Sequence, residues 1–123
     1  MVPSSQEERR RYPRLDIRIF SILVLVRPVA GEALDIFPGD ISIGGISFQT
    51  DVVLHIADQL QLTLGFPANP LPEQVLAQVV WTHLSDKKGE HGRILYDVGI
   101  SFLEISKDAL KEITGLYIRQ SNE

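Results

Sequence analysis

Hydrophobic and polar residues alternate along most of the first hundred positions of the chain. Alternation with a period of two is typical of β-strands that bury one face. The pattern predicts six strands, each bounded by Gly, Pro or polar residues, over residues 15–26, 33–37, 46–51, 59–66, 73–84 and 91–103. From Phe20 to Val26 the first strand is almost wholly apolar, so we expect this part to be buried on both faces or to lie deep in a barrel. Pro38 and Gly39 are expected to end the second strand.

A helical pattern replaces the alternation near the C-terminus. Ser106 is a favourable N-cap, and Asp108 is suited to the positive end of a helix dipole. Leu110, Ile113 and Tyr117 then recur at helical spacing, which predicts a helix over about residues 107–120. Short strands at this spacing predict a mainly β fold, a six-stranded antiparallel β-barrel over about residues 15–104 with a C-terminal α-helix.

The composition indicates one globular domain and is compatible with a reducing compartment. The chain has 123 residues, of which 44% are hydrophobic and 23% are charged. The sequence has no apolar run of the roughly 18 residues that a membrane span needs, and its first residues do not resemble a signal peptide. It has no cysteine, which excludes disulfides and thiolate chemistry. We therefore expect a cytoplasmic protein without a membrane span.

The sequence offers little support for catalysis or metal binding. His55, His83 and His91 lack the short spacing of metal ligands, and no catalytic motif is present. Trp81 alternates with apolar residues of its strand and is expected to belong to the core. Gly44-Gly45 is interpreted as a turn that needs positive φ. The protein is therefore predicted to be a binding protein and not an enzyme, with no cofactor.

The basic residues are concentrated near the N-terminus. Five of the twelve Lys and Arg residues lie between Arg9 and Arg18, and all five are arginine, although the formal net charge is −4. An arginine fork binds phosphate or the O6 and N7 atoms of guanine through two hydrogen bonds, which lysine cannot do. A solvated basic arm is the alternative interpretation.

Five residues of the chain carry the groups that would be needed to bind a guanine dinucleotide. Its phosphates need cations, and the N1 and N2 groups of guanine need an acceptor such as a carboxylate. A serine hydroxyl can bind either part, and a glycine allows close approach of the backbone. These residues are Arg10, Arg14, Asp40, Ser42 and Gly45.

The same residues carry a resemblance to a known family. Arg10-x-x-x-Arg14 followed by Asp40-x-Ser42-x-x-Gly45 resembles the two motifs of the PilZ family, bacterial receptors for cyclic di-GMP. The segment Tyr96-Asp97-Val98-Gly99-Ile100-Ser101-Phe102 also resembles a late strand of that family. The similarity extends over roughly residues 8–120.

The resemblance implies a six-stranded barrel that binds cyclic di-GMP on its outer surface. Arg10 and Arg14 would contact phosphate and guanine, and Asp40 and Ser42 would hold a guanine edge. Arg9, just before the first motif, would contact a second, intercalated ligand molecule. Pro38-Gly39 departs from the family pattern, in which a strand runs into the aspartate, so we expect Asp40 to be less rigidly placed.

These features predict a polar tail over residues 1–8 and a PilZ-like domain over residues 9–123, in which residues 9–14 form an arginine arm. We expect the like-charged arm to be mobile without ligand and to order when the ligand phosphates neutralise it. The ordered arm would form a surface for a downstream protein partner. The alternative is a ligand-independent PilZ-like interaction module. Binding to a nucleic-acid polymer is disfavoured by the acidic remainder of the chain.

Overall fold

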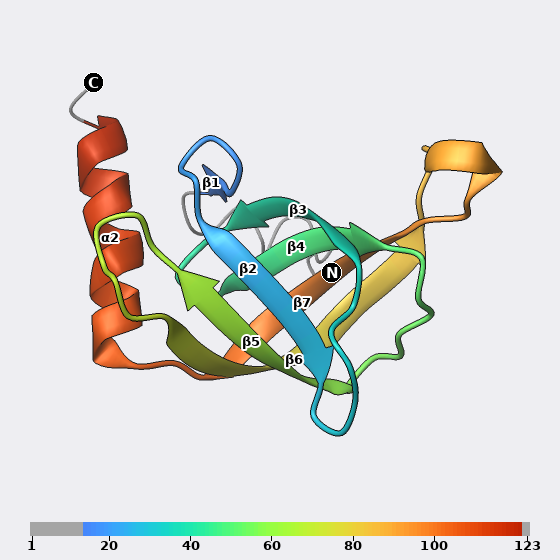
Figure 1. Ribbon diagram of the computed structural model, residues 1–123, viewed down its shortest axis with the longest axis horizontal. Helices are drawn as coiled ribbons and strands as arrows, with labels where there is room; N and C mark the ends of the chain where they lie inside the picture. The colour runs from blue at the N-terminus through green and yellow to red at the C-terminus, as the bar shows by residue number, and fades with distance from the viewer. Residues whose placement is uncertain (1–13, 122–123) are drawn as a thin grey trace, which may run out of the picture.

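The computed structural model describes residues 14–121. The predicted tail over residues 1–8 and all of the arginine arm except Arg14 lie outside the described residues. The elements are β1 (Leu15–Asp16), β2 (Leu23–Pro28), β3 (Ile36–Ile41), β4 (Gly45–Thr50), β5 (Gln59–Gly65), β6 (Glu73–Leu84), the 3₁₀ helix η1 (Glu90–Gly92), β7 (Tyr96–Glu104) and the helix α2 (Lys107–Ser121). The fold is mainly β with one C-terminal helix, as predicted (Figure 1).

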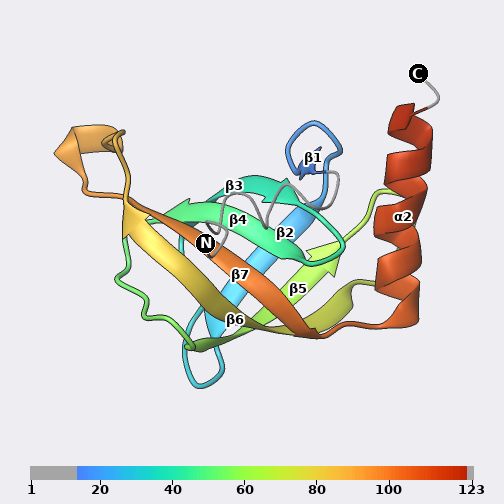
Figure 2. The same cartoon turned by 180° about the vertical axis from the view of Figure 1, so that it is seen from behind.

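The strands form one curled antiparallel sheet. Their order is β1-β3-β4-β7-β6-β5-β2, which places β1 and β2 at its two ends. No strand pairing within residues 14–121 joins these two ends, so the predicted closed barrel of six strands is corrected to an open, curled sheet of seven. Helix α2 lies at one end of the molecule, and the loop that carries η1 lies at the opposite end (Figures 1 and 2).

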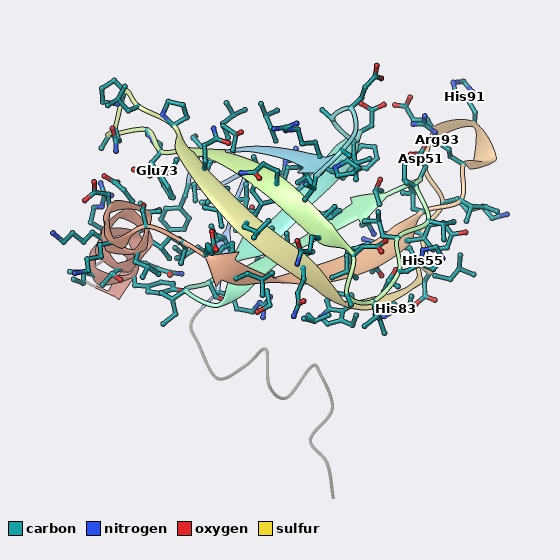
Figure 3. All side chains as sticks on the ribbon, turned by 90° about the horizontal axis from the view of Figure 1, so that it is seen from below. Asp51, His55, Glu73, His83, His91 and Arg93 are labelled. Carbon is teal, nitrogen blue, oxygen red and sulfur yellow. The ribbon has the colours of Figure 1, made fainter. Side chains whose placement is uncertain are left out.

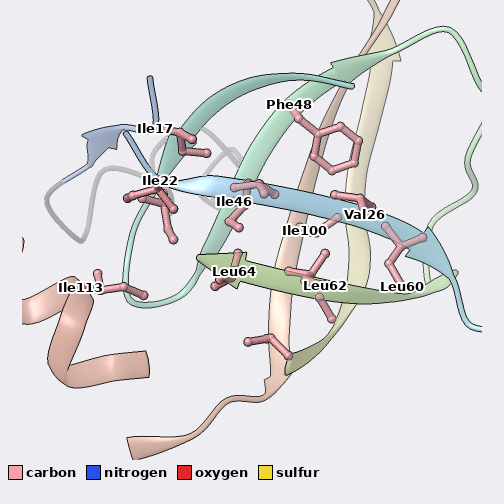
Figure 4. Close-up of a cluster of buried hydrophobic side chains, with 14 of the residues drawn as sticks. Ile17, Ile22, Val26, Ile46, Phe48, Leu60, Leu62, Leu64, Ile100 and Ile113 are labelled. Atoms are coloured by element: carbon pink, nitrogen blue, oxygen red, sulfur yellow. The ribbon is translucent and has the colours of Figure 1, made fainter. Parts of the chain in front are cut away.

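The hydrophobic core fills the inside of the curled sheet (Figure 4). Leu60, Leu62 and Leu64 of β5 are buried on the inner face, as their alternation predicts. Helix α2 adds Ala109 and Ile113 to the same cluster. The core thus lies on the inner face of the sheet, and the side chains that alternate with it point to the outer face.

A turn divides the strand that the sequence predicts over residues 15–26. The carboxylate Oδ1 of Asp16 accepts hydrogen bonds from the backbone N–H groups of Arg18 (2.9 Å) and Ile19 (3.2 Å). This local capping competes with strand pairing, and Ser21 follows with a positive φ of 55°. The alternation of residues 15–19 therefore does not continue into the sheet, and Ile19 is 75% exposed.

The expectation that the second half of this segment is buried on both faces is also wrong. Val24 and Val26 of β2 are buried, whereas Leu23 and Leu25 are exposed. β2 is an end strand of the sheet, and the core covers only its inner face. An apolar sequence cannot by itself distinguish this position from a central one.

Strand β3 continues through Pro38 and Gly39, where the sequence predicts its end. The register with β4 shifts between Pro38 and Ile41, which is a β-bulge, and proline is tolerated at such sites. A Cβ on Gly39 would lie 2.7 Å from Ser47 Oγ and 2.9 Å from its carbonyl oxygen, so glycine allows β3 to approach β4. Asp40 therefore lies within a strand, and the predicted end of the strand before it is wrong.

Helix α2 begins after Ser106, as predicted. The hydroxyl Oγ of Ser106 accepts a hydrogen bond from Ala109 N at 3.0 Å, which caps the first turn. The preceding strand begins later than predicted, at Tyr96, because residues 90–92 form η1 and His91 and Gly92 adopt positive φ. No helix within the described residues has the length and hydrophobicity needed to cross a membrane.

Candidate functional site

An ion pair joins the two predicted motifs. Arg14 Nη2 lies 2.7 Å from Asp40 Oδ1, and the side chains are 22% and 31% exposed. Arg14 immediately precedes β1, and β1 pairs with β3 so that Asp16 lies opposite Asp40. The sheet thus brings together two residues that are 26 positions apart in sequence. Because water still reaches both side chains, the pair remains able to contact a ligand.

Ser47 of β4 fixes the orientation of the Asp40 carboxylate. Its hydroxyl donates to Asp40 Oδ1 at 2.8 Å and accepts a hydrogen bond from Asp40 N at 3.2 Å. Sequence reasoning did not identify Ser47 as a site residue. The available signal was its outward position in the alternating pattern of residues 46–51, next to a predicted turn. Its partner could not be known, because the bulge in β3 decides which residue lies opposite.

Ser42 and Gly45 shape the hairpin between β3 and β4. Ser42 is only 5% exposed, its Oγ accepts a hydrogen bond from Gly44 N at 3.1 Å, and its N–H donates to Gly45 O at 2.9 Å. A Cβ on Gly45 would overlap the carbonyl oxygen of Ile100 on β7. Glycine is thus needed here for close approach, and the expected positive φ is wrong, since Gly92 alone among the described glycines has one.

The remaining predicted site residues, Arg9 and Arg10, lie outside the described residues. The structure thus brings Arg14 and Asp40 into contact and places Ser42 and Gly45 in the adjoining hairpin. The predicted ligand contacts of all six residues stay predictions.

A groove of about 320 Å³ lies beside the Arg14–Asp40–Ser47 cluster on the outer face of the sheet. Four adjacent strands, β3, β4, β7 and β6, form its floor. It is lined by Phe37, Pro38, Gly39, Ser47, Phe48, Gln49, Trp81, His83 and Asp97. Gly39, which precedes Asp40, and Ser47, which donates a hydrogen bond to Asp40, both line the groove. The Arg14–Asp40–Ser47 cluster therefore borders one end of it. His83, at the other end, lies toward the loop that carries His91 and Arg93 (Figure 3).

Trp81 lines this groove and does not belong to the buried core, which corrects the prediction. The register of β6 against β7 shifts between Val79 and Trp81, so Val79 pairs with Ile100 and Trp81 pairs with Gly99. This bulge moves Trp81 from the inner to the outer face of the sheet. The indole lies over Gly99, where any side chain would collide with it.

A chain of polar contacts continues along the groove from Trp81. The ring of Trp81 stacks on that of His83, with centroids 5.0 Å apart and an interplanar angle of 15°. His83 Nε2 lies 3.6 Å from Asp97 Oδ2, and Asp97 Oδ1 accepts a hydrogen bond from Gln49 Nε2 at 2.8 Å. Gln49 also donates to Ser85 Oγ at 3.1 Å. Two aromatic rings on β6, a carboxylate on β7 and an amide on β4 thus form one connected set of contacts.

Tyr117 links helix α2 to the hairpin. Its hydroxyl accepts a hydrogen bond from Ile43 N at 3.0 Å. Burial raises the pKa of Tyr117 above its ordinary value of 10.0, and this effect exceeds the lowering by the Ile43 hydrogen bond and by the charge of Arg14. The hairpin that contains Ser42 and Gly45 is therefore hydrogen-bonded to the terminal helix through a neutral phenol.

Comparison with solved structures identifies similar folds. The inhibitor of motility MotI/DgrA of Bacillus subtilis aligns with a TM-score of 0.65 and 19% identity, over 100% of this chain and 58% of that one. MrkH, a cyclic di-GMP-dependent transcription regulatory factor, aligns with a TM-score of 0.67 and 20% identity, over 93% of this chain and 52% of that one. The chain therefore spans little more than half the length of these two proteins.

A third structure matches at the scale of one domain. The PilZ domain of YcgR from Escherichia coli, solved with cyclic di-GMP, aligns with a TM-score of 0.64 and 14% identity, over 93% of this chain and 92% of that domain. No curated protein sequence matches the chain. The family model described as "PilZ domain" matches residues 8–119, which is nearly the entire sequence. The chain belongs to the PilZ domain family.

Proposed function

We propose that this protein is a cyclic di-GMP receptor that acts as an adaptor for a protein partner. The observation that carries the proposal is the Arg14–Asp40–Ser47 cluster at the border of a groove on the outer face of the sheet. Two similar structures support it, since the YcgR domain contains cyclic di-GMP and MrkH is described as dependent on it.

The cluster offers the groups that a guanine nucleotide needs. The guanidinium of Arg14 is a planar cation that is 22% exposed beside Asp40, and such a group can contact a phosphate or guanine O6 and N7. The Asp40 carboxylate can accept from guanine N1–H and N2–H, and Ser47 prevents it from turning away. In this proposal Arg9 and Arg10 add cationic contacts, and Ser42 and Gly45 set the hairpin beside the ligand.

The size of the groove is compatible with a dinucleotide. The strands β3, β4, β7 and β6 are consecutive in the sheet, and three strand spacings amount to about 14 Å. The Arg14–Asp40 pair occupies one end of this distance, and Trp81 with His83 occupies the other. An aromatic face at the second end provides a stacking surface for a base.

The adaptor part of the proposal concerns the arginine arm, residues 9–14. Bound phosphates would neutralise its arginines and hold it against the outer face of the sheet. A partner protein would then recognise the surface formed by the arm and the ligand. The alternative, a ligand-independent interaction module, would need no such step.

Calorimetric titration of cyclic di-GMP into wild type and Arg14→Ala tests the receptor proposal. Loss of charged hydrogen bonds from Arg14 should weaken binding by about 1.5–3 kcal/mol, or roughly ten- to hundredfold. The matched control is Arg93→Ala, because Arg93 also forms an ion pair, with Asp51 at 2.9 Å, but lies outside the groove. The control should bind like wild type. Absence of binding by wild type would contradict the proposal and favour the interaction module.

A further inference from the structure

We infer that Asp97 is a second guanine-recognising carboxylate, which reads the base at the end of the groove opposite Asp40. The inference rests on the proposed function, and it assigns a ligand contact to a residue outside both motifs. It also assigns a chemical specificity, for guanine over adenine, to that end of the groove.

The position of Asp97 places it within reach of the second base of a dinucleotide. Asp97 on β7 pairs directly with Gln49 on β4, and Gln49 follows Ser47 by two residues on the same outer face. This offset is about 7 Å along β4 plus one strand spacing of about 5 Å across to β7. Asp40 lies one strand beyond Ser47, on β3, so the two carboxylates lie on the order of 10 Å apart along one groove.

Asp97 lines the groove, and its two carboxylate oxygens differ in their hydrogen bonding. Gln49 Nε2 donates to Oδ1 at 2.8 Å and so fixes the orientation of the carboxylate. Oδ2 lies 3.6 Å from His83 Nε2, which is too long for a hydrogen bond, and no other described residue bonds to it. The Asp97 side chain is 32% exposed. An oriented acceptor that borders the groove is thus open to a ligand.

The chemistry of this acceptor favours guanine. Guanine presents two adjacent donors, N1–H and N2–H. Oδ2 can accept from one of them, and Oδ1, which has a second lone pair besides the one that Gln49 uses, can accept from the other. Adenine presents an acceptor at N1 and has no amino group at C2, so its N1 lone pair would face the carboxylate. A site built to accept hydrogen bonds discriminates strongly against an analogue that lacks the donors. The stacked rings of Trp81 and His83, next to Asp97, can support the face of the same base.

Asp97→Asn separates this inference from the proposed function. The asparagine keeps an oxygen for Gln49 but replaces the ionised acceptor of Oδ2 by an amide. The single tryptophan of the chain lines the groove, so Trp81 fluorescence can follow titrations of cyclic di-GMP and cyclic di-AMP. Asp58→Asn is the matched control: Asp58 also lies beside a histidine, at 3.7 Å from His55, but outside the groove.

We expect Asp97→Asn to weaken cyclic di-GMP binding about ten- to hundredfold and to reduce the preference over cyclic di-AMP by a similar factor. Asp58→Asn should bind within about twofold of wild type. The affinities for the two ligands are measured on one preparation of each variant. Partial misfolding would lower both apparent affinities alike, so it would leave their ratio unchanged.

Three outcomes would overturn the inference. If Asp97→Asn binds like wild type while Arg14→Ala loses binding, Asp97 is not a ligand contact and the proposed function stands. If both ligands weaken equally, Asp97 is not specific for guanine. If wild type binds no cyclic di-GMP, the inference fails together with the proposed function.

Discussion

At Gly45 the backbone of β4 lies so close to β7 that a methyl group would overlap the Ile100 carbonyl oxygen. This residue belongs to the second motif, yet its requirement arises from strand packing. A glycine is usually attributed to a special φ angle, and here that explanation fails. The identity of such a residue therefore reflects the neighbouring strand as much as any ligand.

Substitution of two glycines should have opposite effects on stability. Gly45→Ala would force β4 away from β7 and should lower the free energy of unfolding by about 1–3 kcal/mol. Gly115→Ala in helix α2 adds a methyl group with nothing within 4 Å, so it should raise the free energy of unfolding by about 0.5–1 kcal/mol. Urea denaturation of both variants measures the difference. Equal stability of Gly45→Ala and wild type would show that the hairpin can move without cost.

At the scale of elements, the β3–β4 hairpin and helix α2 form one connected unit. Tyr117 on the helix accepts the hydrogen bond of Ile43 N in the hairpin, although the two residues are 74 positions apart. The bulge in β3, the first strand of the hairpin, directs Asp40 toward Ser47. The site is thus held from both sides by elements whose contact is not local in sequence.

Tyr117→Phe should destabilise the protein at neutral pH. The substitution leaves the Ile43 N–H without its acceptor, which should cost about 0.5–1.5 kcal/mol of the free energy of unfolding. Ile118→Ala provides a control on the exposed side of the same helix and should change stability much less, because its side chain is 58% exposed. Urea unfolding of both variants against wild type measures the effect. If Tyr117→Phe is as stable as wild type, the hydrogen bond does not hold the helix to the hairpin.

The same tyrosine predicts a pH dependence. Its pKa is raised above 10.0 in the folded protein, mainly by burial, so the folded state holds the phenolic proton more tightly than the unfolded chain. This contribution to stability is complete below the unfolded pKa and is lost as pH rises through the folded one. The stability difference between wild type and Tyr117→Phe should therefore narrow above pH 10.0. A difference that widens there would show that the pKa is lowered.

At the scale of the whole molecule, the arginine arm and the outer face of the sheet would act together. The formal net charge of the chain is −4, although the arm, residues 9–14, carries four arginines. Cyclic di-GMP carries two phosphates and can bridge such an arm to the groove. The proposed adaptor role depends on this bridge.

NMR relaxation of the arm provides the corresponding test. Saturation with cyclic di-GMP should change the backbone relaxation of residues 5–15 toward values typical of the sheet. Residues 107–112, in the first turns of α2 and outside the groove lining, serve as an internal reference that should not change. Binding without a change in residues 5–15 would contradict the adaptor mechanism and leave the receptor proposal intact.

The sequence by itself determined the elements whose signals are local. Alternating leucines place β5 with its inner face buried, and Ser106 marks the start of α2, because side-chain periodicity and capping act within a few residues. The two motifs also predicted that Arg14 and Asp40 lie at one site, because their groups suit the same ligand, but their direct ion pair comes from the structure alone.

Only the tertiary structure decided what depends on register. A bulge in β6 moves Trp81 to the outer face, and a bulge in β3 carries the strand through Pro38-Gly39 and brings Asp40 to Ser47. One extra residue in a strand moves the side chains that follow it to the opposite face of the sheet, and no local sequence pattern indicates where this occurs. The neighbours of Asp97 and the open ends of the sheet likewise depend on which strands meet, which long-range packing decides.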